Sequence, residues 1–152
     1  MPPAPVSTLD SHAGYWLRFV SNHVSHGFRR KVESHGATVA EWVVMRALLE
    51  SDGVNPSELA ESIGLTRGAV SRLIDRLVAK RLVSCRSERE DRRYQIVKLT
   101  AAGRRLVPVL AALADENDAE FFGHLGVRER AALVAVLQGI AERHGLKGAP
   151  LE

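Results

Sequence analysis

The sequence predicts a mainly α-helical protein with one small β-hairpin, in which a winged helix-turn-helix is flanked by helices on both sides. Three observations support this prediction. Residues 56–75 (PSELAESIGLTRGAVSRLID) have the spacing of two short helices joined by a tight turn. Residues 82–99 change to a β-like pattern with a charged centre. The segments before and after these motifs are long, apolar and helical in period.

The tight turn in residues 56–75 carries the most specific signals. Gly64 stands in the turn, where a residue without a Cβ reaches a positive φ at no steric cost. Thr66 is placed to cap the second helix, and the small Ala60 stands where two helices cross closely. The apolar positions that complete the pattern are Leu59, Ile63, Leu65, Val70 and Leu73. This combination is typical of a helix-turn-helix, whose second helix reads the DNA major groove, and an ordinary αα-hairpin is the alternative.

A long first helix is expected over residues 10–34, with Asp10 or Ser11 as its N-cap and Gly36 near its end. Its apolar side chains recur at helical spacing at Tyr15, Phe19, Val20, Val24, Phe28 and Val32. A second helix, VAEWVVMRALLES, should follow a cap at Thr38.

The third helix should begin after Asn55, with Pro56 at its first position and Glu58 completing a capping-box pattern. The fourth is expected over about 67–80. Strands at 82–85 and 95–99 then form the wing, with a charged tip between them.

Two more helices should follow the wing. Thr100 is placed to cap one over about 101–122, which Pro108 would kink, and the other covers about 127–144. The final residues, GLKGAPLE at 145–152, are expected to fray.

The order of elements predicts four regions: a flexible arm at 1–9, a dimerisation helix at 10–36, the winged helix-turn-helix at 38–99, and C-terminal dimerisation helices at 100–146. The run at 106–114 is too apolar for a lone surface helix, so we expect a homodimer packed through both flanking regions. The alternative is that these helices fold back on their own domain.

The charge distribution points to a phosphate-rich partner. The whole chain of 152 residues has a net charge of only +3, but residues 66–98 carry +6 and the remainder −3. No apolar run approaches the length of a membrane span, and the first residues lack the basic and apolar regions of a secretory signal. The single Cys85 provides no disulfide framework, and these features together predict a cytoplasmic protein.

The predicted recognition helix offers side chains suited to double-stranded DNA. Thr66 and the free N–H groups beside it should hold a phosphate. Gly68 permits close approach, and Arg76 with Lys80 should contact the DNA backbone. Base edges or nearby phosphates are expected to meet Arg67, Ser71 and Arg72, whereas Val70, Leu73, Ile74 and Leu77 should be core.

From about Ser11 to His144 the chain resembles the MarR family of bacterial transcription regulators. The resemblance rests on TRGAVSRLIDRLVAKRLV at 66–83 and EDRRYQIVKLTAAGRRL at 90–106. It implies an obligate dimer, a pseudo-palindromic operator and repression relieved by a small molecule. It also implies that Arg93 inserts into the minor groove. Asp91 is expected to brace the wing by pairing with Arg92, and the remaining wing arginines, Arg86 and Arg89, to meet phosphates; a turn-favouring Asp91 is the alternative.

In the resembled family, effectors bind between the dimerisation helices and the winged domain. The residues available there are Tyr15, Trp16, Phe19, Trp42 and Arg46, which suit a small aromatic acid. The alternative is that these aromatics are core and Arg46 is a surface residue.

Metal, redox and catalytic functions have weaker support. His23 and His26 stand three residues apart, but no further ligand completes a metal site, and no cofactor is predicted. Cys85 would need a lowered pKa to sense oxidants, for which Arg86 is the neighbouring cation, whereas the resembled family's peroxide sensors carry their cysteine on the first helix. No nucleophile–base pair, P-loop or dinucleotide motif indicates an enzyme. An effector-free architectural DNA-binding protein, a metal- or redox-responsive regulator and a protein-binding winged module stay as alternatives.

Overall fold

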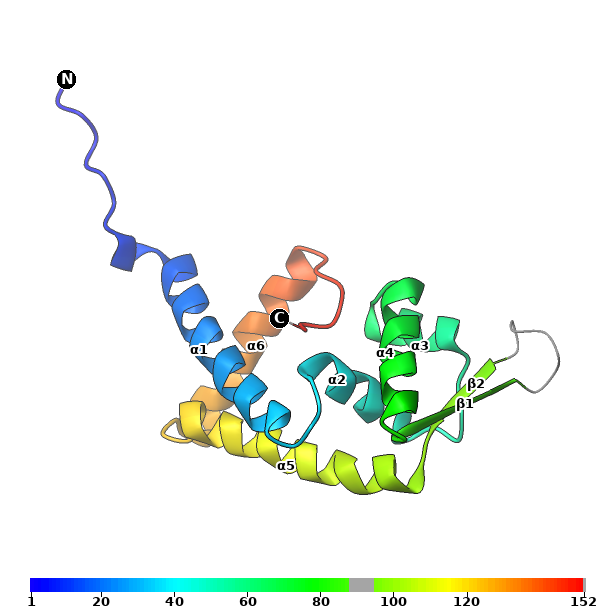
Figure 1. The fold of residues 1–152 in the computed structure, drawn as a ribbon. Coiled ribbons are helices and arrows are strands. Elements are labelled where there is room, and N and C mark those ends of the chain that lie inside the picture. Colours follow the sequence, from blue (N-terminus) through cyan, green and yellow to red (C-terminus); the bar gives the residue numbers. More distant parts are fainter. Residues whose placement is uncertain (88–94, 152) are drawn as a thin grey trace.

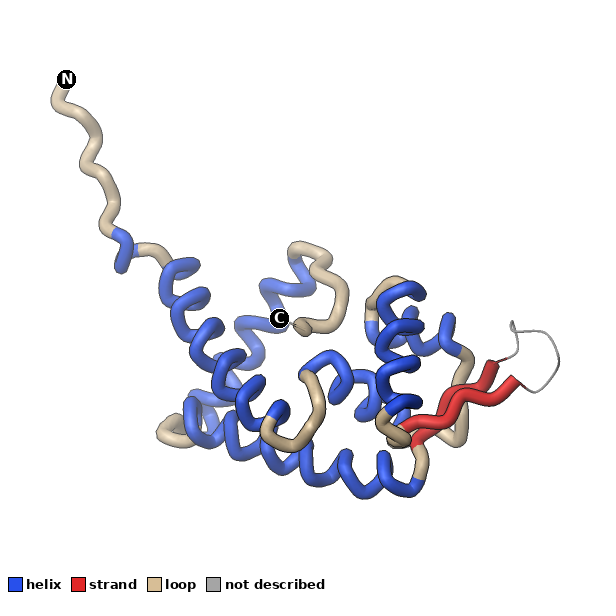
Figure 2. The backbone as a smooth tube through the Cα atoms, in the orientation of Figure 1, coloured by secondary structure: helices blue, strands red, loops and turns tan. Residues whose placement is uncertain are grey.

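The computed structural model describes residues 1–87 and 95–151. This part of the chain is mainly helical, with one antiparallel pair of strands (Figures 1 and 2). In chain order its elements are η1 (Leu9–Ser11), α1 (Ala13–Glu33), α2 (Val39–Leu48), α3 (Pro56–Ile63), α4 (Arg67–Ala79), β1 (Val83–Ser87), β2 (Gln95–Leu99), α5 (Ala101–Phe122) and α6 (Val127–Arg143). The predicted fold class is confirmed, and no helix of the described part is long and apolar enough to cross a membrane.

The long helix α5 connects two halves of the molecule. In Figure 1 it runs along the base, with α1 and α6 at one end and α2, α3, α4 and the β1–β2 wing at the other. The chain continues helically through Pro108, which lies inside α5.

The hydrophobic core lies in the winged half. Its buried side chains come from α2, α3, α4, both strands and the first half of α5, with Val32 at the end of α1 and Ala37 before α2. On α4 the four residues predicted as core are buried, namely Val70, Leu73, Ile74 and Leu77. Ala60 is also buried, as its place at a close helix crossing predicts. The apolar pattern therefore correctly identified the inward face of the helix-turn-helix.

The wing is a short antiparallel hairpin tied to the rest of the domain. The strands pair from Val83 opposite Leu99 to Ser87 opposite Gln95. Val54, before α3, adds two backbone hydrogen bonds to Val97, of 2.8 and 3.0 Å. The first strand begins and ends slightly later than the predicted 82–85, because Leu82 N–H instead bonds Leu77 O and closes the end of α4.

The start of α5 fixes the base of the wing. Thr100 accepts a hydrogen bond from Gly103 N–H, and its own hydroxyl donates to Arg81 O. A Cβ at Gly103 would collide with the carbonyl oxygen of Leu82. A glycine at this position therefore permits α5 to pack directly on the α4–β1 connection.

The start of α1 differs from the prediction. Its N-cap is His12 rather than Asp10 or Ser11, because the preceding residues form η1 and the Ser11 hydroxyl donates to Thr8 O. Trp16 Nε1 donates to Asp10 O at 2.9 Å and so holds η1 against the first turn of α1.

The apolar run at 106–114 does not by itself require a partner, contrary to the prediction. Val107 and Leu110 are fully buried in the core of their own chain, and Leu106 and Leu113 pack against it. This part of α5 follows the fold-back alternative. The exposed apolar surface lies elsewhere: none of α6 is buried, and Val32 is the only buried residue of α1.

The prediction that residues 145–152 fray is also wrong for the residues that the structure describes. Ala149 N–H donates to Ile63 O at 3.1 Å, and Gly148 lies against Gly64 in the turn between α3 and α4. In Figure 1 this segment is the red trace that leaves α6 and turns back toward α2. The small residues of this segment allow its backbone to lie close to the turn. From composition alone, the same small residues also predict a flexible tail.

Candidate nucleic-acid interface

Local capping sets the geometry of the helix-turn-helix. Asn55 accepts a hydrogen bond from Ser57 N–H at the start of α3, where Pro56 occupies the first turn. Gly64 ends α3 with φ of 70°, in the left-handed region that the sequence predicts for it. Thr66 then accepts from Ala69 N–H at 3.2 Å and starts α4. Each side-chain cap of this kind stabilises a helix by about 1 kcal/mol.

The outer face of α4 is basic and accessible. Arg67, Arg72 and Arg76 are exposed, and within the described part of the chain none of them forms a hydrogen bond or an ion pair. Gly68 and Ser71 are exposed on the same helix, and nothing lies within 4 Å of a Cβ built on Gly68. The DNA backbone could approach such a helix closely. Its unpaired guanidinium groups suit contacts with phosphates and base edges.

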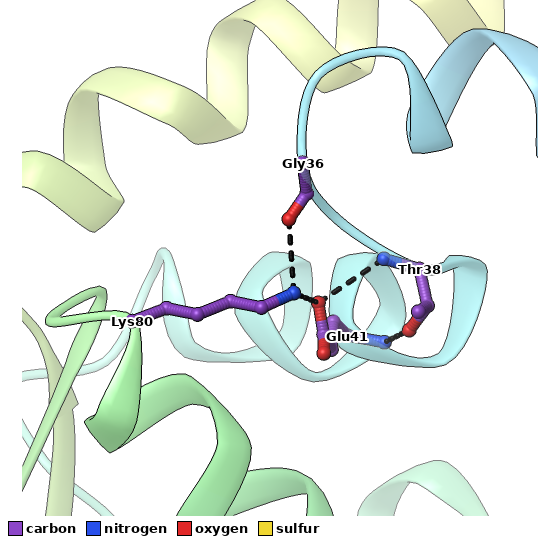
Figure 3. Close-up of polar contacts among 4 residues, drawn as sticks. All are labelled: Gly36, Thr38, Glu41 and Lys80. Carbon is purple, nitrogen blue, oxygen red and sulfur yellow. Dashed lines mark hydrogen bonds and ion pairs between the residues drawn. The ribbon is translucent and has the colours of Figure 1, made fainter.

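An ion pair with a buried carboxylate joins α4 to α2. Lys80 Nζ lies 2.8 Å from Glu41 Oε2 and 2.9 Å from Gly36 O (Figure 3). Glu41 is buried, and it forms a reciprocal capping box with Thr38 at the start of α2. Lys80 was predicted to contact DNA, but its ammonium is held by these groups because its side chain reaches back toward α2. Sequence reasoning missed Glu41, although an acid three residues after a capping threonine was the available signal.

Only the base of the wing can be compared with the predicted contacts. Arg86 is exposed near the end of β1, just before the charged tip in the sequence. The other predicted wing residues, Arg89, Asp91, Arg92 and Arg93, lie outside the described residues.

A cavity of about 450 Å³ lies between α1, α2 and α5. Trp42 and Val43 of α2 line it, together with Phe28 and Arg29 of α1. Within the described part of the chain Arg29 forms no hydrogen bond or ion pair. The sequence prediction included Trp42 but missed Arg29, which stands one helical turn after Ser25, another residue of the cavity lining.

The remaining predicted ligand residues do not meet at this cavity. Arg46 pairs with Glu50 at the surface, with a 3.4 Å separation between Nη2 and Oε1. Tyr15, Trp16 and Phe19 form a cluster of aromatic rings on the exposed part of α1. Trp16 lines a separate apolar hollow between α1 and α6. The structure thus separates Tyr15, Trp16 and Phe19 from Trp42.

A polar contact shapes one wall of the 450 Å³ cavity. Asn117 of α5 is buried, and its Nδ2 donates to Val24 O at 3.1 Å while its Oδ1 accepts from Lys31 Nζ. Gly27 permits this close crossing, because a Cβ there would lie 2.9 Å from Asn117 Oδ1. Asn117 therefore determines how near α1 and α5 approach at the cavity.

The thiol of Cys85 is in an environment opposite to that of a reactive cysteine. Burial in the wing raises its pKa, and the carboxylate of Asp75 raises it further. The neighbouring Arg86 does not reverse this direction. Within the described residues, no group of three or more His, Cys, Asp or Glu side chains is placed to hold a metal ion.

Comparison with known proteins identifies the fold and its class. A model of the MarR family matches residues 35–93, which span α2 to the wing. The chain belongs to the MarR family of winged helix-turn-helix transcriptional regulators. It is therefore a DNA-binding transcription regulator and not an enzyme, as the sequence predicts.

Similar proteins cover most of the chain. The transcriptional regulator HosA of Escherichia coli O157:H7 is 27% identical over 131 residues, covering 86% of this chain and 96% of HosA. The structure of BpsR from Bordetella bronchiseptica, which concerns the regulation of its DNA binding by 6-hydroxynicotinic acid, is 27% identical with a TM-score of 0.73, covering 84% of this chain and 97% of BpsR. CouR from Rhodococcus jostii RHA1, bound to p-coumaroyl-CoA, is 26% identical with a TM-score of 0.75, covering 90% of this chain and 96% of CouR.

Proposed function

We propose that this MarR-family regulator is a cytoplasmic homodimeric repressor that binds a pseudo-palindromic operator and is released by a small aromatic acid. The observation that carries the DNA-binding half is the unpaired basic face of α4, formed by Arg67, Arg72 and Arg76. This face stands on a helix whose opposite side is buried, so the helix is held in place and its basic side chains leave it in a defined direction.

The proposed contacts follow from position along α4. Thr66 and the N–H groups beside it hold a phosphate at the helix start. Arg67, Ser71 and Arg72 read base edges where Gly68 allows close approach, and Arg76 neutralises a phosphate further along.

The proposed wing contacts complete the interface. Arg86 and Arg89 meet phosphates, Arg93 enters the minor groove, and Asp91 braces Arg92. These wing roles rest on the sequence resemblance.

A dimer is supported by the apolar surface of α1 and α6. Leu133, Leu137 and Ile140 recur on one side of α6 and are all exposed within the chain. With Trp16 and Leu17 of α1 they line one apolar hollow. Such a surface is unfavourable in water and is covered when a second copy packs on it. Two-fold symmetry of that dimer would match a two-fold operator.

The 450 Å³ cavity is the proposed effector site. Trp42 and Phe28 provide apolar and aromatic walls, and the unpaired guanidinium of Arg29 supplies a partner for a carboxylate. BpsR, whose DNA binding is regulated by 6-hydroxynicotinic acid, and CouR, which was crystallised with an aromatic acyl thioester, support an aromatic effector. Arg29 replaces Arg46 in this proposal, because Arg46 lies at the surface and pairs with Glu50.

Fluorescence anisotropy tests both halves of the proposal. The protein is titrated onto DNA flanking its own gene and onto scrambled DNA at several salt concentrations, with and without 6-hydroxynicotinic acid and related acids. We expect selective binding that weakens steeply with salt and is released by at least one acid. Selective binding that no acid releases would contradict the effector half. Equal binding to both DNAs would favour the architectural alternative.

Arg29→Gln is the matched test of the effector site, with Arg46→Gln as its control. We expect Arg29→Gln to bind DNA normally and to require roughly tenfold more acid for release, since a charge-assisted hydrogen bond of about 1.5–3 kcal/mol is lost. Equal acid sensitivity of the two variants would place the carboxylate elsewhere.

A further inference from the structure

Residues 146–151, called the strap below, run from the end of α6 back to the winged domain. Gly145 turns the chain with φ of 59°, and Leu146 N–H closes the last turn of α6 on Ala141 O. The strap then contacts two places that the proposed function makes important, the α3–α4 turn and the effector cavity.

The first contact is with the turn that precedes the recognition helix. Ala149 N–H donates to Ile63 O at 3.1 Å, at the last residue of α3. Gly148 lies so close to Gly64 that a Cβ built on Gly64 would be 2.6 Å from the Cα of Gly148. Gly148 itself has φ of 101°, a conformation in which a side chain is strained. The backbone of the strap is therefore fitted to the turn.

The second contact is with the cavity. Ala149, Pro150 and Leu151 form part of its lining, together with Phe28 of α1 and Trp42 of α2. Only one peptide bond separates Pro150 in the cavity wall from the Ala149 residue that bonds Ile63. Displacement of Pro150 and Leu151 would thus act directly on the hydrogen bond at the end of α3.

We propose that the strap couples the effector cavity to the helix-turn-helix. The inference rests on the proposed function, because it assigns a signalling route to the same effector site. With the cavity empty, the strap holds the α3–α4 turn in the position that suits operator binding. An aromatic acid in the cavity displaces Leu151 and Pro150, the Ala149–Ile63 hydrogen bond is lost, and the turn is released. A ligand shifts the equilibrium between docked and displaced strap only if it binds the two states with different affinities. Here the acid binds the displaced state more tightly, because the docked strap competes with it for the cavity.

Two variants are designed to detach the strap, one at its contact with the α3–α4 turn and one at its contact with the cavity. Gly148→Val places a branched side chain where φ is positive and where the new Cβ would lie 3.3 Å from Gly64 O. Leu151→Asp puts a charge into the cavity wall. Lys147→Ala is the control, since Lys147 is exposed and forms no hydrogen bond or ion pair within the described part of the chain.

Hydrogen exchange of the Ala149 amide measures docking without any effector. We expect protection in the wild-type protein and in Lys147→Ala, and loss of protection in both detaching variants. Anisotropy then measures operator affinity, which should fall about five- to tenfold in Gly148→Val and in Leu151→Asp, at the lower end of the usual range of coupling between sites. Circular dichroism confirms that the variants are folded.

The same titrations with 6-hydroxynicotinic acid test the coupling. We expect the acid to weaken operator binding of wild-type protein strongly and of Gly148→Val little, while still binding the free variant at least as tightly. An unprotected Ala149 amide in wild-type protein, or unchanged operator affinity in both detaching variants, would overturn the strap. Failure of the acid to release wild-type protein would contradict the proposed effector instead, and the exchange and affinity measurements would still decide the strap.

Discussion

Lys80 at the end of α4 is paired with the buried carboxylate of Glu41 at the start of α2, at 2.8 Å (Figure 3). The carboxylate belongs to the first turn of α2, where it also accepts the Thr38 N–H. One side chain therefore joins the start of α2 to the end of α4. The orientation of α4, and of the arginines that we propose to contact DNA, depends on this joint as well as on the apolar core.

Glu41→Gln should destabilise the fold, because Lys80 loses the charge that balances its ammonium. We expect a loss of about 1–2 kcal/mol in the free energy of unfolding, below the 3–5 kcal/mol of a fully buried pair since Lys80 is partly exposed. Urea denaturation measures it. Glu50→Gln is the control, since its pair with Arg46 is exposed and should contribute less than about 0.5 kcal/mol. Equal stability of the two variants would contradict the structural role of Glu41.

Gly103→Ala should weaken the joint between the wing and α5. Its Cβ would meet the carbonyl oxygen of Leu82, a backbone atom that cannot rotate away. Overpacking of this kind costs about 1–3 kcal/mol, which thermal or urea unfolding resolves. Gly68→Ala, with open space around its Cβ, should leave stability unchanged or slightly higher. If Gly103→Ala were as stable as Gly68→Ala, the α4–β1 connection at Leu82 could move to make room for the Cβ. That result would contradict the close packing of α5 on this connection.

Cys85 should react slowly with iodoacetamide at pH 8. Burial and then Asp75 raise the pKa of its thiol, so the native protein holds less thiolate than the unfolded chain at this pH. Because the thiol pKa is raised in the folded protein, the contribution of Cys85 to the free energy of unfolding is complete below the ordinary thiol pKa. It is lost as the pH rises through the raised pKa. Alkylation rates of native and urea-unfolded protein against pH provide the check. Faster reaction of the native thiol at pH 8 would restore the redox-sensor hypothesis.

Leu137→Asp should prevent dimerisation, because it places a charge in the apolar face of α6 that we assign to the partner. Sedimentation should detect a folded monomer with much weaker operator binding. Ala135→Asp is the control, since at about 100° per residue it stands on the opposite side of the same helix. A dimeric Leu137→Asp protein would contradict the assignment of this face.

Local rules predicted the winged domain well for a physical reason. Caps at Thr38, Asn55, Thr66 and Thr100 and the positive φ of Gly64 are decided by neighbouring residues, and the structure confirms them. The inward face of α4 followed from its period alone. These features need no knowledge of distant contacts.

Contacts between distant segments were the ones that the sequence did not reveal. The Glu41–Lys80 pair joins residues far apart in the chain, as does the Ala149–Ile63 bond of the strap. An apolar run such as 106–114 has the same composition whether it meets its own core or a second copy. Arg29 was missed because a cavity forms only when α1, α2 and α5 are assembled.

We propose that α4 reads the operator sequence, and Arg72→Ala tests this role most directly. The measured quantity is the ratio of affinities for operator and scrambled DNA, by anisotropy at constant salt. We expect the free-energy difference that corresponds to this ratio to fall by about 1–3 kcal/mol, since a base-edge contact is lost. Arg76→Ala should instead weaken binding to both DNAs alike and reduce the salt dependence. An Arg72→Ala protein with the wild-type ratio would contradict sequence reading by this face of α4.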